Sequence, residues 1–171
     1  MARVNVATQL RVLVCGETAR GDDAVALTAV EALPTEVLAR VIIVRCGQLE
    51  VGHLLDVPDG AACVVIDAAV GVAPGEIVAI PLDAIAARGG TPGPRSSHTL
   101  PPDEAIRLAA ALRGRPPEGV FVGIGGSDFR LGAGLSPAVR SALPAFVDRL
   151  ASEIVRLAPG LRPHPIDDPG A

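Results

Sequence analysis

The chain has 171 residues, a net charge of −4 and 49% hydrophobic residues, which is typical of one folded domain with a sizeable core. Every one of its 15 basic residues is an arginine, which excludes Schiff-base chemistry and a Walker-type phosphate loop because both require a lysine amine. With no Tyr, no Trp and no basic stripe, the composition also argues against nucleic-acid binding.

The amino-terminal segment predicts neither export nor membrane insertion. Residues 1–9 carry Arg3 and several polar residues and lack the apolar stretch of a signal peptide. No run in the chain approaches the ~18 apolar residues that span a bilayer. We therefore expect a cytoplasmic protein without a membrane partner.

Apolar runs and helical patterns alternate along the chain. Strands are expected at Leu10–Cys15, Val37–Cys46, Ala61–Val70, Glu76–Pro81 and Val120–Ile124. Helices are expected at Ala24–Leu33, Pro102–Leu112 and Pro137–Leu157. Ser136 and Pro137 form an N-cap and first-turn pair for the last helix.

This alternation predicts an α/β fold with three layers, a mostly parallel sheet of about five strands with helices on both faces. The link of residues 71–75 is too short for a helical crossover, so Glu76–Pro81 is expected to be an antiparallel edge strand. Residues 1–158 should form the single domain. Residues 159–171 contain four prolines and are expected to form a disordered tail.

Acidic side chains and one histidine mark the edges of these elements. Asp22 and Asp23 open the first helix, Asp67 follows a buried apolar run, and a Gly/Pro-rich loop carries His98. Ligands of open parallel sheets collect at the carboxyl ends of the strands, which is where the three acids should meet. Two carboxylates and one imidazole would suit nickel, zinc or manganese and leave open positions.

Each of these residues also has a structural alternative. Asp22 or Asp23 could cap a helix, and Asp67 could satisfy a buried hydrogen bond. His98 could simply precede the helix that starts at Pro102. Together they fit metal ligation better than separate roles.

The three cysteines, Cys15, Cys46 and Cys63, lack the spacing of a structural zinc site or a disulfide framework. We expect reduced thiols packed in strands. Because Cys15 and Cys46 end strands at the same rim, a cysteine hydrolase with His98 as the base is an alternative.

Several motifs, in this order, resemble the hydrogenase maturation endopeptidases. They are Gly21-Asp22-Asp23 after the first strand, Asp67-Ala68, Ser96-Ser97-His98 and the late Gly134–Pro137 segment. The resemblance extends from about residue 10 to residue 157 and identifies the chain as a divergent member.

The resemblance implies a peptidase that removes a C-terminal extension from a nickel-iron hydrogenase large-subunit precursor after nickel insertion. It implies that Asp23, Asp67 and His98 contact the nickel, which arrives with the precursor and is not a resident cofactor. Asp22, Asp23 and Asp67 are the expected catalytic acids, with Asp22 a candidate general base.

One segment departs from the family pattern. Where the family has Asp-Gly-Gly-Thr at the end of the second strand, this chain has Arg45-Cys46-Gly47-Gln48. An inactive maturation factor that binds the metal or the precursor without cutting it is therefore the alternative function.

Overall fold

The computed structural model describes residues 9–88 and 101–158 and contains one five-stranded sheet with the order β2-β1-β3-β5-β4. The strands are β1 (Leu10–Cys15), β2 (Val41–Gly47), β3 (Ala62–Ala69), β4 (Ile77–Pro81) and β5 (Glu118–Gly125). β2, β1, β3 and β5 are parallel, and β4 pairs antiparallel with β5 at the edge. The predicted mostly parallel sheet with an antiparallel edge strand is confirmed.

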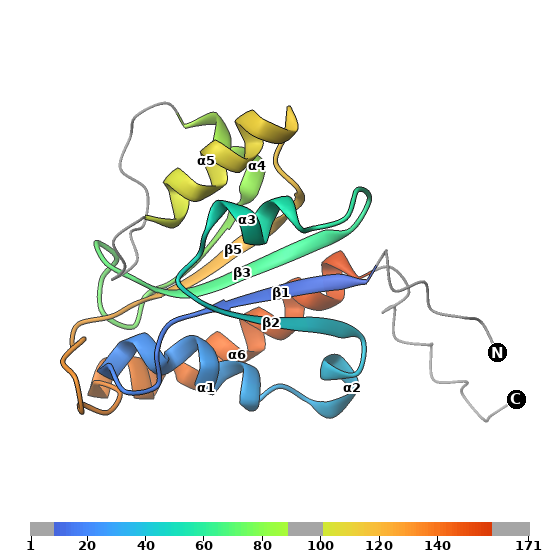
Figure 1. Cartoon of the computed structure of the whole chain (residues 1–171). Helices are drawn as coiled ribbons and strands as arrows, with labels where there is room; N and C mark the ends of the chain where they lie inside the picture. The colour runs from blue at the N-terminus through green and yellow to red at the C-terminus, as the bar shows by residue number, and fades with distance from the viewer. Residues whose placement is uncertain (1–8, 89–100, 159–171) are drawn as a thin grey trace, which may run out of the picture.

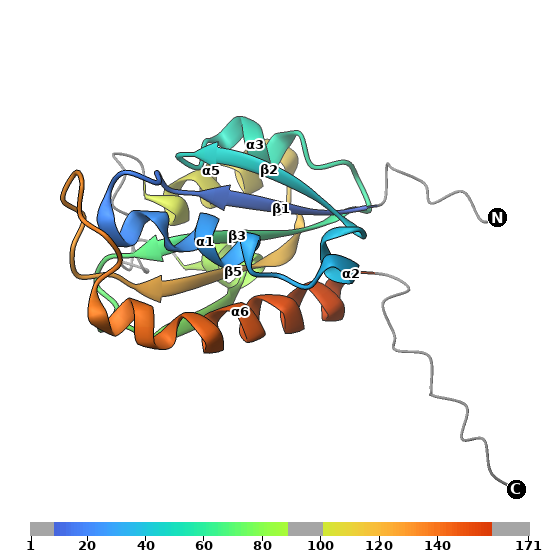
Figure 2. The ribbon, with the colours of Figure 1, turned by 90° about the horizontal axis from the view of Figure 1, so that it is seen from below.

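Helices cover both faces of this sheet, as Figures 1 and 2 show. One layer holds the 3-10 turn η2 (Gly21–Ala24), α1 (Val25–Glu31), α2 (Thr35–Leu38) and α6 (Pro137–Leu157). The other layer holds α3 (Val51–Leu55), α4 (Leu82–Ala87) and α5 (Pro102–Arg113). Each layer packs on its own apolar core cluster, so the sheet is the middle of three layers.

The position of β3 at the centre of the sheet explains why its sequence is continuously apolar and does not alternate. All eight of its residues are buried, since helices cover it on both faces and strands flank it on both edges. Asp67 is the one charged residue in this strand. Its burial therefore needs a reason beyond packing.

Two local predictions were wrong or incomplete. The second strand begins at Val41 and not at Val37, because Pro34 starts the short helix α2, in which Val37 is buried against the core. The helices α3 and α4 were not predicted, since segments of five and six residues are too short to show a helical period. The predicted tail, 159–171, lies outside the described residues.

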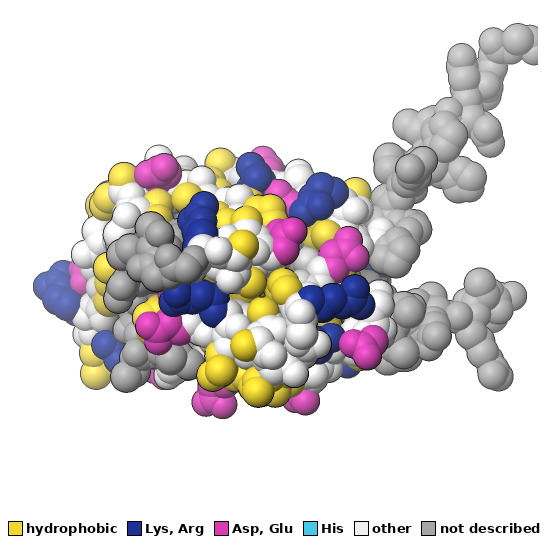
Figure 3. Space-filling model, turned by 90° about the horizontal axis from the view of Figure 1, so that it is seen from above, with side chains coloured by type: hydrophobic (Ala, Val, Ile, Leu, Met, Phe, Trp, Pro, Cys, Tyr) yellow, Lys and Arg dark blue, Asp and Glu magenta, His cyan; other side chains and the backbone are white. Residues whose placement is uncertain are grey.

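The surface over α3, α4 and α5 carries charges of both signs. Figure 3 shows arginines and acidic side chains interspersed with apolar ones across this face. The layer of α3, α4 and α5 therefore presents a mixed, solvent-facing surface.

Within the described ranges, no helix combines the length and apolar content needed to cross a membrane.

Candidate active site

Three buried aspartates lie at the carboxyl edge of the parallel strands. Asp67 is close to the end of β3, while Asp22 and Asp23 lie in η2, which packs against β3 and follows the loop leaving β1. The exposed fractions of Asp22, Asp23 and Asp67 are 0%, 1% and 0%. The structure thus brings the three predicted acids to the edge where open α/β sheets bind ligands, and shelters them from water.

Asp22 ties two loops together. Its Oδ2 accepts hydrogen bonds from the backbone N–H groups of Ser127 (2.8 Å) and Asp128 (3.0 Å), and its Oδ1 accepts one from Ser136 (2.6 Å). Burial alone would raise the pKa of Asp22, but these backbone hydrogen bonds outweigh it, so the pKa lies below its ordinary value. Asp22 therefore holds the loop between β5 and α6, and its carboxylate does not cap its own helix.

The backbone around Asp22 reinforces this connection. The Asp22 N–H donates to the Asp128 carbonyl oxygen (2.7 Å), and the Gly21 N–H donates to that of Ala133 (3.1 Å). Gly21 has a φ of 59°, and a Cβ there would clash with the Asp128 carbonyl oxygen. The sequence around Asp22 is thus shaped to receive a segment more than 100 residues away.

Asp23 is held by the loop that leaves β1. Its Oδ2 accepts a hydrogen bond from the Glu17 N–H (2.9 Å). Gly16, with a φ of 103°, lies so close that a Cβ would clash with the Asp23 carbonyl oxygen. The Gly16 N–H in turn donates to the Gly47 carbonyl oxygen (2.6 Å), which fastens this loop to the end of β2.

Asp67 lies beside the end of β1 on the face covered by α3, α4 and α5. Val65, two residues earlier in β3, packs in the core under those helices, and side chains alternate along a strand. Leu13 pairs with Val65, so Cys15 is the neighbour of Asp67 in β1. The loop that follows Cys15 holds the Asp23 carboxylate, so both carboxylates lie at this end of β1.

The thiol of Cys15 has a second neighbour, Cys46. The hydrogen bond with Cys46 and burial, followed by the charge of Asp67, raise the pKa of Cys15 well above its usual value. The same hydrogen bond lowers the pKa of Cys46, which is partly exposed. Burial raises the pKa of Cys63 to about 12, as expected of a packed thiol. The pairing of Cys15 with Cys46 was not predicted, although both cysteines end adjacent strands.

Arg45 stands where the resemblance to the family predicts an aspartate at the end of the second strand. It faces away from Asp67 and the two thiols. It pairs with Val14, a member of the core cluster under α1 and α6, and its guanidinium lies 3.6 Å from the Glu31 carboxylate. The two side chains are 61% and 66% exposed, so the ion pair contributes little to stability. The positive charge of Arg45 therefore lies on the other face of the sheet from Asp67.

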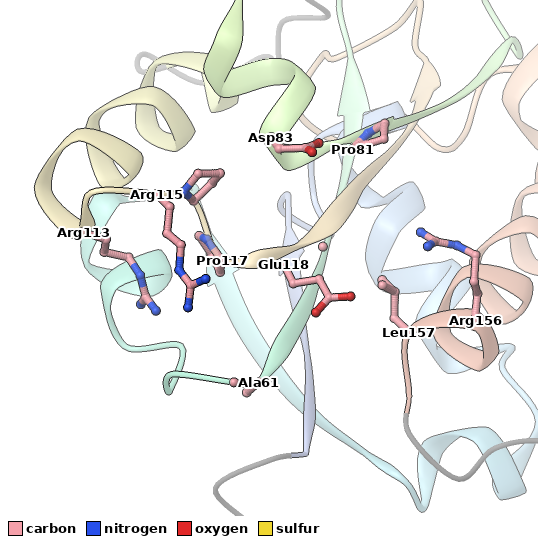
Figure 4. Close-up of a pocket in the computed structure, with 12 residues that line it drawn as sticks. Ala61, Pro81, Asp83, Arg113, Arg115, Pro117, Glu118, Arg156 and Leu157 are labelled. Carbon is pink, nitrogen blue, oxygen red and sulfur yellow. The ribbon is translucent and has the colours of Figure 1, made fainter.

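A separate cavity of about 450 Å³ lies at the opposite, amino end of the strands (Figure 4). It lies between the start of β5 at Glu118 and the end of β4 at Pro81, with Arg113, Arg115 and Arg156 on its walls. Arg113 donates to the carbonyl oxygens of Leu54, Leu55 and Val57, and to Asp59. This arginine secures the end of α3 and the loop that leads to β3.

Arg113→Ala should therefore destabilise the fold by roughly 1.5–3 kcal/mol, because charge-assisted hydrogen bonds to several carbonyl groups are lost. Urea unfolding measures the loss. Arg115→Ala, from the same cavity, is the matched control and should change the unfolding free energy by under about 0.5 kcal/mol. Equal losses of stability in the two variants would show that Arg113 does not secure the end of α3 and the loop that leads to β3.

The third predicted metal ligand, His98, lies outside the described residues. Among residues 9–88 and 101–158, no group of three His, Cys, Asp or Glu side chains is arranged to hold a metal ion. The metal trio of Asp23, Asp67 and His98 therefore stays a prediction.

A family described as hydrogenase maturation protease matches residues 29–153 of this chain. The matched span contains Asp67 and His98 and begins after Asp22 and Asp23. No curated protein matches the chain.

Solved structures share the fold. The NiFe hydrogenase maturation protease HycI from Thermococcus kodakarensis has a TM-score of 0.60 at 22% identity, over 86% of this chain and 92% of its own. The NiFe hydrogenase maturation protease HybD from the same organism has a TM-score of 0.59 at 25% identity, over 85% of this chain and 98% of its own. The hydrogenase maturating endopeptidase HybD from E. coli has a TM-score of 0.61 at 20% identity, over 87% of this chain and 93% of its own. With a family match over most of its length and this common fold, the chain belongs to the hydrogenase maturation protease family.

Proposed function

We propose that this protein removes the C-terminal extension of a nickel-iron hydrogenase large-subunit precursor after nickel has been inserted. The observation that carries the proposal is the placement of two buried carboxylates at the carboxyl end of β1, with Asp67 beside Cys15 and Asp23 held by the Glu17 N–H in the loop that follows. Membership of a hydrogenase maturation protease family supplies the class of substrate.

The nickel belongs to the substrate in this proposal. Carboxylate oxygens bind borderline divalent cations, so Asp23 and Asp67 fit the nickel of a loaded precursor, with His98 as the third protein ligand. Three protein ligands leave positions for donors from the precursor. Nickel bound there would orient the C-terminal tail and polarise the scissile carbonyl or a water molecule.

The acids of this chain have different tasks. Asp23 and Asp67 bind the nickel-loaded precursor and fix the position of the scissile bond. Asp22, our candidate general base from the sequence, stays a prediction in that role, and its contacts favour a positioning role. Its two oxygens already accept three backbone N–H groups, and its lowered pKa makes it a weak base.

A processing assay tests the proposal. Nickel-loaded and nickel-free large-subunit precursors are incubated with the protein, and intact mass spectrometry measures the large subunit. We expect a shortened large subunit from the loaded precursor alone. Cleavage of neither form would contradict the proposal, and a stable complex with the uncut loaded precursor would identify an inactive binding factor.

The thiol-hydrolase alternative makes a different prediction. Cys15 is fully buried with a raised pKa, so Cys46 is the better nucleophile of the two. If the carboxylates perform the reaction, Cys46→Ala should keep its processing rate within about twofold, whereas a thiol hydrolase would lose activity by orders of magnitude.

A further inference from the structure

Two cysteines end neighbouring parallel strands beside the proposed site. β1 and β2 pair in register up to Val14 and Arg45, and an irregularity then sets Cys15 opposite Gly47, with Cys46 between the two pairs. Cys15 belongs to the core cluster under α3, α4 and α5, and Cys46 packs against that same cluster. Both thiols thus point to the same face of the sheet.

Cys15 and Cys46 end adjacent strands on this face, and the Cys46 thiol donates to the Val44 carbonyl oxygen of its own strand (3.6 Å). Adjacent strands lie about 4.8 Å apart, and disulfides form between residues whose Cα atoms are about 4.4–6.8 Å apart. A bridge between these cysteines therefore requires little backbone movement. Cys46 is partly exposed and can be reached from solvent, while Cys15 has no exposed surface.

We propose that Cys15 and Cys46 form a redox-active dithiol that a hydroperoxide converts to an intramolecular disulfide. The Cys46 sulfur attacks the peroxide oxygen, giving a sulfenic acid and one water from hydrogen peroxide. The Cys15 sulfur then attacks the sulfur of Cys46, forming the S–S bond and releasing a second water. Both thiol protons leave in these waters, and a dithiol reductant reverses the oxidation.

The bridge would act on the site through Cys15, which has Asp67 as a neighbour and continues into Gly16. A disulfide holds its sulfurs about 2.05 Å apart, much closer than a thiol–thiol hydrogen bond. Its formation fixes the Cys15 side chain against β2 and away from Asp67, with little movement of the backbone. Gly16 packs on the Asp23 carbonyl group, so the constraint on the end of β1 also bears on Asp23. We expect the oxidised protein to process its substrate more slowly, a consequence that rests on the proposed function.

The chemistry is tested without any substrate. Reduced full-length protein is treated with equimolar hydrogen peroxide, free thiols are counted, and non-reducing peptide mapping locates the bridge. Free cysteines should fall from three to one per chain, with a loss of two hydrogen atoms in mass and recovery under dithiothreitol. The matched control Cys63→Ala should still form the bridge, whereas Cys46→Ala and Cys15→Ala should not.

Several results would overturn the dithiol. These are an unchanged thiol count, oxidation of Cys46 only to sulfinic or sulfonic acid, or bridges only between chains. Cys46→Ala keeps the test valid if Cys15→Ala does not fold, since Cys46 is the partly exposed partner.

Processing assays on the reduced and oxidised protein then separate the two proposals. A disulfide that forms in a protein unable to process any precursor refutes the proposed function and leaves the dithiol standing. Normal processing by a protein that forms no disulfide refutes the dithiol alone.

Discussion

Asp67→Asn is expected to lower the rate of precursor processing by at least about 100-fold while the protein stays folded. The amide keeps the shape of the side chain inside the fully buried strand β3 but removes the negative charge to which the proposed function assigns the binding of the nickel-bearing substrate. Asp23→Asn should have an effect of similar size, because the loop that follows β1 holds its carboxylate at the same end of that strand. Processing is measured by mass spectrometry of the large subunit, and folding by circular dichroism and thermal unfolding.

Asp83→Asn is the control for this pair of variants. Asp83 is an exposed acid in the first turn of α4 and lines the cavity at the opposite end of the sheet. Its loss should leave processing unchanged. Full activity in both Asp23→Asn and Asp67→Asn would show that these carboxylates take no part in the reaction.

Asp22→Ala is expected to cause the largest loss of stability, roughly 3–5 kcal/mol. The substitution leaves the backbone N–H groups of Ser127, Asp128 and Ser136 without their shared acceptor and opens a space where a buried carboxylate had been. Urea unfolding measures the loss.

Asp128→Ala, in the same loop, is the matched control for Asp22→Ala. The Asp128 side chain forms an exposed ion pair with Arg130, which holds its pKa at about 2. Exposed pairs stabilise weakly, so its removal should cost far less. A comparable loss in the two variants would show that Asp22 does not anchor the loop.

The contribution of Asp22 should also depend on pH. Because its pKa is lower in the folded protein than in the unfolded chain, the carboxylate stabilises the fold above the unfolded pKa. That stabilisation is lost as the pH falls through the folded value. The stability difference between the wild type and Asp22→Asn should therefore be constant above about pH 5 and shrink below about pH 4. A difference that grows toward low pH would contradict the assignment.

The sequence predicted those features that depend on neighbours along the chain. The continuous apolar character of β3 indicated a buried parallel strand, and Asp67 stood out because it interrupts that run. The short link before β4 indicated an antiparallel edge strand. The position of Ser136 before Pro137 correctly marked the start of α6, although the Ser136 side chain makes no capping hydrogen bond.

Contacts between distant residues were beyond sequence reasoning. The local pattern of Asp22 predicted a helix cap or a base, whereas its carboxylate binds backbone groups more than 100 residues away. The pairing of Cys15 with Cys46 depends on the register of β1 and β2 and on the irregularity between Val14 and Cys15. The types and order of residues in the sequence do not show which distant residues come into contact.

Calorimetric titration of nickel(II) into the metal-free protein tests most directly whether Asp23, Asp67 and His98 together contact nickel. The wild type, His98→Ala and the control His53→Ala are compared, since His53 lies in α3 and accepts a hydrogen bond from the Glu50 N–H. We expect nickel to bind the wild type and His53→Ala alike, and binding to be lost in His98→Ala. Equal nickel affinity in all three proteins would show that His98 is not a nickel ligand.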